Sequence, residues 1–429
     1  MPHWLINYTF AAIAPYDYTT DVLIAGAGPA GATTSLFLSK EKISHIIIDK
    51  AVFPRDKICG DALSGKVVEV FKKLDPSLIE EIAAIDREYT PSWGVKFVAP
   101  NYNFIDIPFK SDISKEKHAP GFISKRLDFD NFLVSKLNPE TSTFWQNTEL
   151  VDVLPADGGY AVKLKKEGKE ITLFTKLLVG AEGDRSVVAK KLAGIKMEPE
   201  HYCAGIRAYY KGVEGMHPQN FIELHFLDEL LPGYFWIFPL PNGMANVGAG
   251  ILSKSASKKK VNLREKTLDI INKNPQIAPR FKNAELQGKI QGWGLPLGSK
   301  KRKLSGNGFI LTGDAASMID PFTGEGIGNA MVCGRLAAQT IRKSLEEKDY
   351  SAQALAVYDQ EVYRYLWDEL KLSHTLQKLC KYPWLFNMVV NKASKNTTLR
   401  ETISCMFEDL DMRSRFKDPR FYFKILFGK

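Results

Sequence analysis

The chain has 429 residues, of which 45% are hydrophobic and 25% are charged, close to the average for globular proteins. Its length is enough for about two to three domains. This composition excludes a disordered chain, a collagen-like repeat and a low-complexity polymer, and no run of residues approaches the roughly 18 apolar positions of a membrane-spanning helix.

The N-terminal segment and the cysteines bear on where the chain works. The first residues are apolar, but they contain no Lys or Arg and Asn7 interrupts the apolar run, so we expect no secretory signal peptide. The five cysteines are far apart and form no Cys-x-x-Cys pair, so we expect neither a disulfide framework nor a metal site. Both observations favour the cytoplasm.

The first predicted elements form a βαβ unit. Asp21–Ala25 predicts a short strand, the Ala- and Ser-rich stretch Pro29–Lys40 predicts a helix, and His45–Asp49 predicts a second strand. A strand, a helix and a strand in about thirty residues start a parallel sheet.

Strands of two kinds follow. Thr172–Val179 predicts another strand of the same sort, whereas Phe221–Phe226, Tyr234–Leu240 and Ala245–Ile251 are short alternating segments separated by Pro and Gly turns. The second pattern is typical of an antiparallel sheet and indicates a second domain.

The chain then returns to the first pattern. Gly308–Thr312 predicts a strand that leads into a Gly-rich loop and a helix from about Gly326, and the residues beyond Tyr350 are mostly helical. Parallel elements therefore lie on both sides of the antiparallel block, so the parallel domain is expected to be discontinuous.

The turn after the first strand carries a glycine motif, Gly26-Ala-Gly28-Pro-Ala-Gly31. The first glycine permits the tight turn, the second lets the backbone approach a pyrophosphate, and the third lets helix and strand pack closely. Asp49 ends the next strand, where a carboxylate accepts the hydroxyls of an adenosine ribose. An acidic residue there argues against a 2′-phosphate, so FAD or NAD is expected rather than NADP.

Three later segments resemble the signature of the flavoprotein hydroxylase superfamily. They are Gly180-Ala-Glu182-Gly183-Asp-Arg-Ser186, Gly308-Phe-Ile-Leu-Thr-Gly313-Asp314-Ala-Ala and Asp320-Pro-Phe-Thr-Gly324-Glu-Gly326-Ile327. The resemblance implies that Asp314 holds the ribityl or pyrophosphate region of FAD and that Arg126 reaches its phosphates. The N–H groups of Gly326 and Ile327 would face the pyrimidine edge of the flavin, at a helix N-terminus that favours negative charge.

The middle motif departs from the family pattern. Glu182 stands where the family has Asp, and Ala189 stands where it has Arg, with Lys190 beside it as a weaker substitute. The motif is thought to serve the reductant as well, so the departure leaves open whether the electrons come from NAD(P)H or a reduced ferredoxin.

Two further segments narrow the resemblance to the geranylgeranyl reductase family. They are Pro54-Arg-Asp-Lys57-Ile-Cys59-Gly60 and Tyr234-Phe-Trp236-Ile-Phe238-Pro239, and Pro321–Ile327 matches the family as well. The resemblance spans roughly Asp21 to Arg342. It implies an oxidoreductase that saturates C=C bonds of a prenyl or other apolar lipid by hydride transfer from reduced flavin.

The tyrosine–tryptophan strand is informative on its own. Period two puts Tyr234, Trp236 and Phe238 on one face and two further apolar side chains on the other, so the strand is covered on both sides. One face is expected to pack against the hydrophobic core, and the other either packs against core as well or lines a cavity. In the family this strand lines the substrate cavity, and we expect Phe226, Leu227, Leu230 and Leu231 to extend the lining.

Candidate site residues follow from these motifs. Cys59 is either a small buried hydrophobe or a group beside the flavin, and it is a candidate proton donor together with Tyr234. The residues predicted to be catalytic are Cys59, Tyr234 and Trp236, and those predicted to bind the cofactor are Gly26, Gly28, Ala30, Gly31, Asp49, Lys50, Gly60, Arg126, Glu182, Gly183, Gly313, Asp314, Gly324, Gly326 and Ile327.

The expected architecture is α/β, with a discontinuous FAD/NAD(P)-binding Rossmann-like domain, an antiparallel-sheet substrate domain and a helical C-terminal region. The FAD-binding domain takes residues 18–90, 121–200 and 293–345, the substrate domain residues 91–120 and 201–292, and the helical region residues 346–429. Residues 381–429 hold ten Lys or Arg and five Asp or Glu, interleaved with aromatic residues. This tail either packs on the body as a helical layer or contacts the inner face of a membrane, and no nucleic-acid partner is expected.

Two rival functions remain on the same fold. A flavin monooxygenase or halogenase shares the glycine motifs, but halogenases typically carry Trp-x-Trp-x-Ile-Pro where this chain has Tyr234 and Phe238. A non-enzymatic prenyl-binding chaperone shares the dinucleotide fold, but the intact Gly313-Asp314 motif and Gly326 favour a bound flavin. The sequence names neither the substrate nor the oligomeric state.

Overall fold

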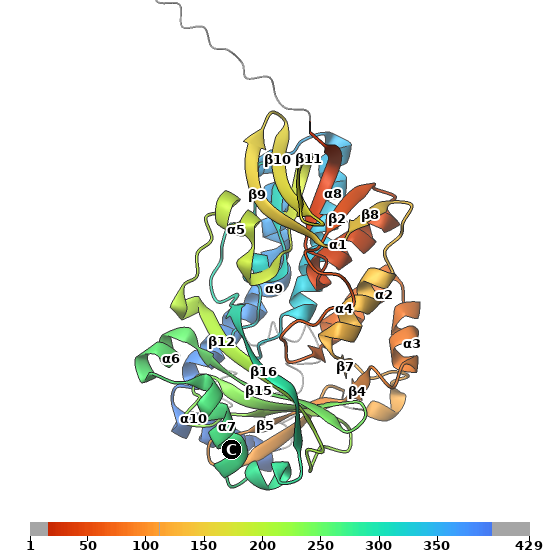
Figure 1. Ribbon diagram of the computed structural model, residues 1–429. Helices are drawn as coiled ribbons and strands as arrows, with labels where there is room; N and C mark the ends of the chain where they lie inside the picture. Colours follow the sequence, from red (N-terminus) through yellow and green to blue (C-terminus); the bar gives the residue numbers. More distant parts are fainter. Residues whose placement is uncertain (1–15, 111, 397–429) are drawn as a thin grey trace, which may run out of the picture.

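The protein was analysed as a computed structural model that describes residues 16–110 and 112–396 (Figure 1). A sheet of eight strands occupies the upper half of Figure 1. Its strands are β1 (Tyr18–Ala25), β2 (His45–Ile48), β8 (Ser142–Trp145), β9 (Thr148–Ala156), β10 (Gly159–Lys166), β11 (Lys169–Gly180), β17 (Ser305–Gly306) and β18 (Phe309–Leu311). The order β18–β11–β1–β2–β8 is parallel throughout. Residues 22–25 of the central strand β1 are fully buried, as expected for a parallel strand covered on both faces.

Helices pack against this sheet or against one another. They are α1 (Pro29–Lys40), α2 (Gly65–Leu74), α3 (Ser77–Ala84), α4 (Arg126–Ser135), α5 (Val187–Leu192), α8 (Ile327–Glu347) and α9 (Ala352–Leu379). Pro29 starts α1, where its missing N–H and fixed φ suit a helix. The contact between α1 and α8 is very close, because a Cβ on Gly334 would lie 2.4 Å from the carbonyl oxygen of Ala30. Small residues on both helices are therefore required.

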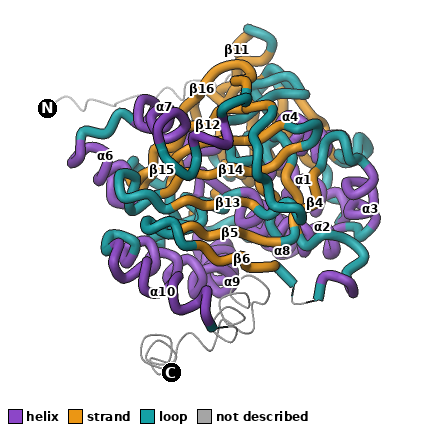
Figure 2. The backbone as a smooth tube through the Cα atoms, turned by 90° about the horizontal axis from the view of Figure 1, so that it is seen from below, coloured by secondary structure: helices purple, strands orange, loops and turns teal. Residues whose placement is uncertain are grey.

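A seven-stranded sheet forms the lower half of Figure 1, and Figure 2 shows its strands in the order β16–β12–β15–β14–β13–β5–β6. The strands are β5 (Gly94–Val98), β6 (Phe104–Pro108), β12 (Tyr202–Lys211), β13 (Ile222–His225), β14 (Tyr234–Leu240), β15 (Met244–Leu252) and β16 (Glu285–Pro296). All neighbours are antiparallel except β13 and β5, which are parallel. The exception arises because β5 and β13 come from separate passages of the chain through this sheet.

The remaining elements include a small third sheet and three helices. Strands β3 (Ala62–Leu63), β4 (Thr90–Ser92) and β7 (Gly121–Ile123) form a third sheet. Helices α6 (Ser253–Lys259) and α7 (Leu263–Lys273) pack on the seven-stranded sheet, and α10 (Pro383–Lys395) lies beside β6 (Figure 2). No helix in residues 16–110 and 112–396 combines the length and the apolar character needed to cross a bilayer.

The predicted α/β class with a parallel sheet, a second, mostly antiparallel sheet and a helical C-terminal part is confirmed. The domain boundaries stay a prediction. Strands β4 and β7, which lie at the predicted boundaries after residues 90 and 120, pair in the same small sheet. Predicted helix Pro29–Lys40 and strand Tyr234–Leu240 match α1 and β14 in full. The C-terminal tail was predicted over residues 381–429, and all beyond residue 396 lies outside the described residues.

Candidate flavin and substrate site

The turn between β1 and α1 has the geometry of an anion site. Gly26 has φ +99°, and a Cβ there would lie 2.4 Å from the carbonyl oxygen of Ala181. A Cβ on Gly31 would lie 1.8 Å from the carbonyl oxygen of Gly26, so both positions require glycine. Helix α1 begins here with no side-chain cap, so its first N–H groups are free for a ligand.

Two arginines face the same turn. A Cβ on Gly28 would find the guanidinium groups of Arg55 and Arg126 at 3.6 and 4.0 Å. Arg126 forms a two-pronged ion pair with Asp130, at 2.6 Å for each bond, and Arg55 contacts the same carboxylate at 2.5 Å. Burial alone would lower the pKa of Arg126, but the Asp130 carboxylate outweighs it and holds this pKa above its usual range. Two cations share one carboxylate, which leaves an excess positive charge beside Gly28.

Asp49 lies at the end of β2, nearly buried. Its carboxylate accepts hydrogen bonds from the backbone N–H groups of Ala27 and Ala51, both at 2.9 Å. These bonds fix the carboxylate beside the glycine turn, at the carboxyl edge of the parallel sheet. Lys50, the next residue, is exposed.

The third glycine segment brings a second helix N-terminus to the site. Gly313, with φ +60°, packs against Ala30 and Ala330, where a Cβ would be 3.1 Å from both methyl groups. Asp314 forms an ion pair with Lys57 at 3.0 Å. Helix α8 has Gly326 at its N-cap with no side-chain cap, and Ile327 begins it. A ligand that spans the two sets of motifs would therefore meet free N–H groups at both ends.

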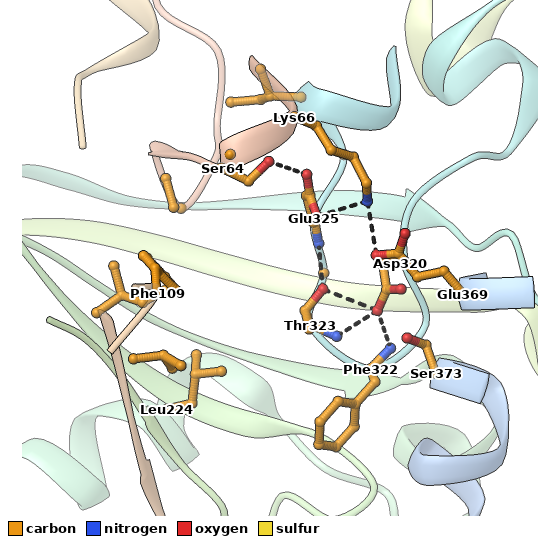
Figure 3. A pocket seen from close by; sticks show the side chains of 18 of the residues that line it. Ser64, Lys66, Phe109, Leu224, Asp320, Phe322, Thr323, Glu325, Glu369 and Ser373 are labelled. Carbon is orange, nitrogen blue, oxygen red and sulfur yellow. Dashed lines mark hydrogen bonds and ion pairs between the residues drawn. The ribbon is translucent and has the colours of Figure 1, made fainter. Parts of the chain in front are cut away.

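A cavity of about 1630 Å³ adjoins this second N-terminus (Figure 3). Cys59, Gly60 and the segment 324–327 line one part of it, and residues of α2, β5, β13, β14, α9 and α10 line other parts. Tyr234, Trp236 and Phe238 form a row of rings on its wall.

The two faces of β14 differ as the alternation predicted. Phe235 and Ile237 pack in a core with α7, while the row of three rings lines the cavity. The expected lining by the loop between β13 and β14 is correct only for Phe226. Leu227 and Leu230 belong to the opposite core, and Leu231 is not part of the lining. The side chains of residues 226–233 diverge because these residues form an irregular turn rather than a strand.

The three predicted catalytic residues meet at this wall. The Tyr234 hydroxyl donates a hydrogen bond to the carbonyl oxygen of Thr323, and burial raises its pKa well above the usual range. The Trp236 indole N–H donates to Asn246 at 2.8 Å. The Cys59 thiol lies against the Arg126 guanidinium. Only Cys59 therefore adjoins both the cavity and the arginine pair.

Comparisons with known proteins agree on one family. A family model described as "FAD binding domain" matches residues 19–368. The digeranylgeranylglycerophospholipid reductase of Methanococcus vannielii is 30% identical over 365 residues, which are 84% of this chain and 87% of that protein. The enzyme of the same name from Methanosarcina acetivorans is 29% identical over 354 residues, 81% of this chain and 80% of that one.

This chain is an FAD-dependent oxidoreductase of the geranylgeranyl reductase family. Solved structures show the same fold. A geranylgeranyl bacteriochlorophyll reductase-like protein from Thermoplasma acidophilum aligns with a TM-score of 0.76 at 21% identity, over 95% of this chain and 98% of that one. A flavin-dependent brominase aligns with a TM-score of 0.74 at 23% identity, over 95% and 99%.

The geometry of this flavoprotein fits FAD. The opening at Gly28 faces two arginines and an uncapped helix, the Asp49 carboxylate is fixed beside the glycine turn, and the uncapped N-terminus of α8 lies by the cavity. These features suit the phosphates, the adenosine ribose and the flavin edge in that order. The individual contacts of the predicted cofactor residues with FAD stay predictions.

The departure in the middle motif has a local structural role. The Glu182 carboxylate accepts hydrogen bonds from Ser186 at 2.6 Å and from the N–H groups of Val187 and Val188 at 3.1 and 3.2 Å. Burial raises the pKa of this carboxyl group. The side chain thus holds the start of α5, which leaves only the backbone of Glu182 and the open side of Gly183 for a cofactor. Ala189 is buried and Lys190 is exposed on the same helix.

A polar part of the cavity wall was missed from the sequence. Lys66 donates hydrogen bonds to Glu325 at 3.2 Å, Asn329 at 2.9 Å and Glu369 at 2.8 Å, and Ser64 donates to Glu325 as well (Figure 3). The residues come from α2 and its N-cap, from α8 and the segment before it, and from α9, so no local motif joins them.

A second missed group lies beneath Trp236. Asn246 donates hydrogen bonds to the carbonyl oxygen of Cys59 and to Asp61, each at 2.8 Å, and Tyr209 donates to Asp61 at 2.7 Å. A sequence signal for it existed, because Asn246 is a polar residue inside an otherwise apolar strand and Asp61 directly follows the Cys59-Gly60 motif.

Proposed function

We propose that this flavoenzyme saturates C=C bonds of a prenyl or similarly apolar lipid. The observation that carries the proposal is the large cavity that runs from segment 324–327 along the ring-lined face of β14. Pockets for small ligands usually occupy roughly 300–1,000 Å³, so the volume of about 1630 Å³ suits a long chain. The names of the curated relatives, which are reductases of a digeranylgeranyl lipid, support the same substrate class.

The residues of the wall bind and orient such a chain. Trp236, Phe238 and Phe226 offer apolar rings, and burying hydrocarbon against them is worth about 25 cal/mol per Å². FAD, when bound and reduced, supplies a hydride to one carbon of the double bond. The uncapped N–H groups at Gly326 and Ile327 would stabilise the negative charge that reduction places at that end. Apolar walls exclude water and hold the bond at this end of the cavity.

The electrons are proposed to come from NAD(P)H or a reduced ferredoxin. The Glu182 and Ala189 departures give no preference between them, since Glu182 is engaged with α5. Adding each donor to the oxidised enzyme without oxygen, and recording which one removes the visible absorbance of the oxidised flavin, distinguishes the two.

A membrane contact is proposed at the start of α10. Tyr382 and Trp384 are 56% and 68% exposed, and their neighbours Leu385 and Phe386 line the cavity. Exposed aromatic rings beside basic residues are typical of interfacial anchors. A lipid could then pass from the bilayer into the cavity directly. Sedimentation with anionic vesicles tests this contact, and Trp384→Ala is expected to weaken it several-fold.

The central test uses enzyme reduced in the absence of oxygen. Addition of an unsaturated prenyl lipid is expected to restore the oxidised flavin spectrum. The product should be heavier by two hydrogens for each double bond saturated, since a hydride and a proton are added. Free reduced FAD with the same lipid is the control. If no alkene restores the spectrum, whereas oxygen and an aromatic substrate give a hydroxylated product, the enzyme is a monooxygenase instead.

A further inference from the structure

One acid on the cavity wall has an unusual position. Asp61 directly follows Cys59-Gly60, lines the cavity and is fully buried. Its φ of +68° lies in the left-handed region, which residues other than glycine seldom adopt. Its backbone oxygen accepts from the N–H of Ser124 at 3.0 Å. The surrounding structure therefore holds this carboxyl group in place against local strain.

The two oxygens of this carboxyl group have different surroundings. Oδ2 accepts both side-chain hydrogen bonds, from Tyr209 at 2.7 Å and Asn246 at 2.8 Å. Oδ1 is buried and has no hydrogen-bond partner among the described residues. Because Oδ2 is already an acceptor for two donors, the proton of the neutral acid belongs on Oδ1. Asp61 is among the residues that line the cavity, and a buried polar atom without a protein partner is a place where a ligand or an ordered water is expected.

Burial also favours the neutral acid. It raises the pKa of Asp61 to about 6, against the lowering effect of the hydrogen bonds from Tyr209 and Asn246 and of the nearby Arg207. The Asp56 carboxylate, paired with Arg207 at 2.7 Å, raises it further. Asp61 can thus hold a proton close to neutral pH and release it readily, whereas the Tyr234 hydroxyl, whose pKa burial raises, is protonated but a much weaker acid.

We propose that Asp61 donates, from Oδ1, the proton that completes the saturation of the double bond. The inference rests on the proposed reductase function. The π bond of the alkene is lost and two C–H bonds form, one with the hydride supplied by reduced FAD and one with the Asp61 proton. The alkene is reduced by two electrons, the flavin is oxidised by two, and Asp61 is left as a carboxylate that takes a proton from water before the next turnover.

The test is Asp61→Asn, which keeps the shape and an oxygen acceptor but has no acidic proton. Expected results are unchanged FAD content, affinity within about twofold for a saturated prenyl lipid measured by fluorescence quenching, and unchanged oxidation of the reduced enzyme by ferricyanide. Oxidation by the unsaturated lipid should fall by roughly 10²- to 10⁴-fold, the usual contribution of a general acid. Asp106→Asn, a change on β6 outside the cavity lining, is the control and should behave as wild type.

The pH profile provides a second, independent readout. In wild type the rate of alkene-dependent oxidation should fall as pH rises through about 6, because the donor must be protonated. Tyr209→Phe removes a hydrogen bond that lowers this pKa, so the falling limb should move to higher pH.

The outcomes separate this inference from the proposed function. If wild type is oxidised by the lipid and Asp61→Asn keeps its rate, Asp61 is not the donor although the reductase function stands. If Asp61→Asn has lost affinity for FAD or for the lipid, the pH–rate profile of Tyr209→Phe decides. A falling limb at the same pH as in wild type overturns the inference. If no alkene oxidises the reduced wild type, the proposed function fails first.

Discussion

The side chain of Asn246 joins Trp236 to the loop at Cys59. It accepts the indole N–H at 2.8 Å and donates to the Cys59 carbonyl oxygen at 2.8 Å. The Trp236 ring also packs against Gly248, where a Cβ would come within 2.3 Å of it. The Trp236 ring is thus fixed against the sheet and is linked, through the Asn246 side chain, to the loop that precedes Asp61.

Trp236→Ala should impair the lipid reaction and leave FAD binding intact. The change removes a ring from the wall and leaves empty volume, which is expected to cost about 2–3 kcal/mol of lipid binding, or roughly 30- to 150-fold in kcat/KM. The ratio of flavin to protein absorbance should not change. Trp367→Ala, on α9 outside the lining, is the matched control. Equal losses in both variants would indicate a general folding defect.

The glycine turn offers a sharper test of cofactor binding. A methyl group on Gly28 meets only the ends of Arg55 and Arg126 at 3.6 Å or more, so Gly28→Ala should fold normally. It should bind FAD at least tenfold more weakly, because the methyl group occupies the space through which the pyrophosphate approaches. Equilibrium dialysis of the apoprotein measures the affinity.

Two other glycines serve as references for that experiment. Gly31→Ala should lower the stability itself, since its Cβ would lie 1.8 Å from a backbone oxygen. Gly292→Ala, in β16 with ordinary clearance of 3.6 Å, should change neither property. If Gly28→Ala bound FAD as tightly as wild type, the phosphates would have to lie elsewhere.

Asp49→Ala should also weaken FAD. The charge-assisted hydrogen bonds to the ribose are worth roughly 1.5–3 kcal/mol, so the affinity should fall by about 10- to 150-fold. The same carboxylate accepts the N–H groups of Ala27 and Ala51, so Asp49→Asn is a useful companion that keeps one acceptor. Normal affinity in both variants would remove Asp49 from the site.

The parts of this protein that could be predicted are those that depend on local sequence. Helix α1 and strand β14 were located to the residue, because Pro29 and the glycines mark one and period-two rings mark the other. The polar groups around the cavity were not predicted. Lys66 is 259 positions from Glu325 and 303 from Glu369, and the three meet only because α2, the segment before α8 and α9 pack together. Asp61 required the backbone turn that aims its side chain at Asn246.

A buried ion pair on β13 predicts that the folded protein loses stability in acid. Glu223 is 1% exposed and accepts hydrogen bonds from Arg280 at 2.6 and 2.9 Å and from His225 at 3.0 Å. Burial alone would raise the pKa of Glu223, but these partners lower it to about 2. Its contribution to stability is therefore present above about pH 4.5 and is lost as the pH falls toward 2.

Glu223→Gln should accordingly reduce the free energy of unfolding at pH 7 by about 3 kcal/mol, since it leaves Arg280 with a neutral partner. Urea unfolding at pH 7 and pH 3 measures the effect, which should be smaller at the lower pH. Lys273→Gln, which removes an exposed ion pair with Asp269, should leave the stability close to that of wild type, because solvent screens such a pair. A loss at pH 7 no larger than that of the control would contradict the assignment.

Asp61 should show the opposite pH dependence of stability. Its pKa is raised from 3.8 to about 6 by burial, so the folded chain holds a proton that the unfolded chain has released over that range. The stabilising contribution of the neutral acid is complete below about pH 3.8 and is lost as pH rises through about 6, a change of about 3 kcal/mol. Asp61→Asn stays neutral at every pH, so relative to wild type it should be more stable at pH 8 than at pH 4. Urea unfolding of both proteins at these two pH values measures the difference. A stability gap that does not change between them would mean that Asp61 ionises as it does in water, which would also remove the acid on which the proton donation depends.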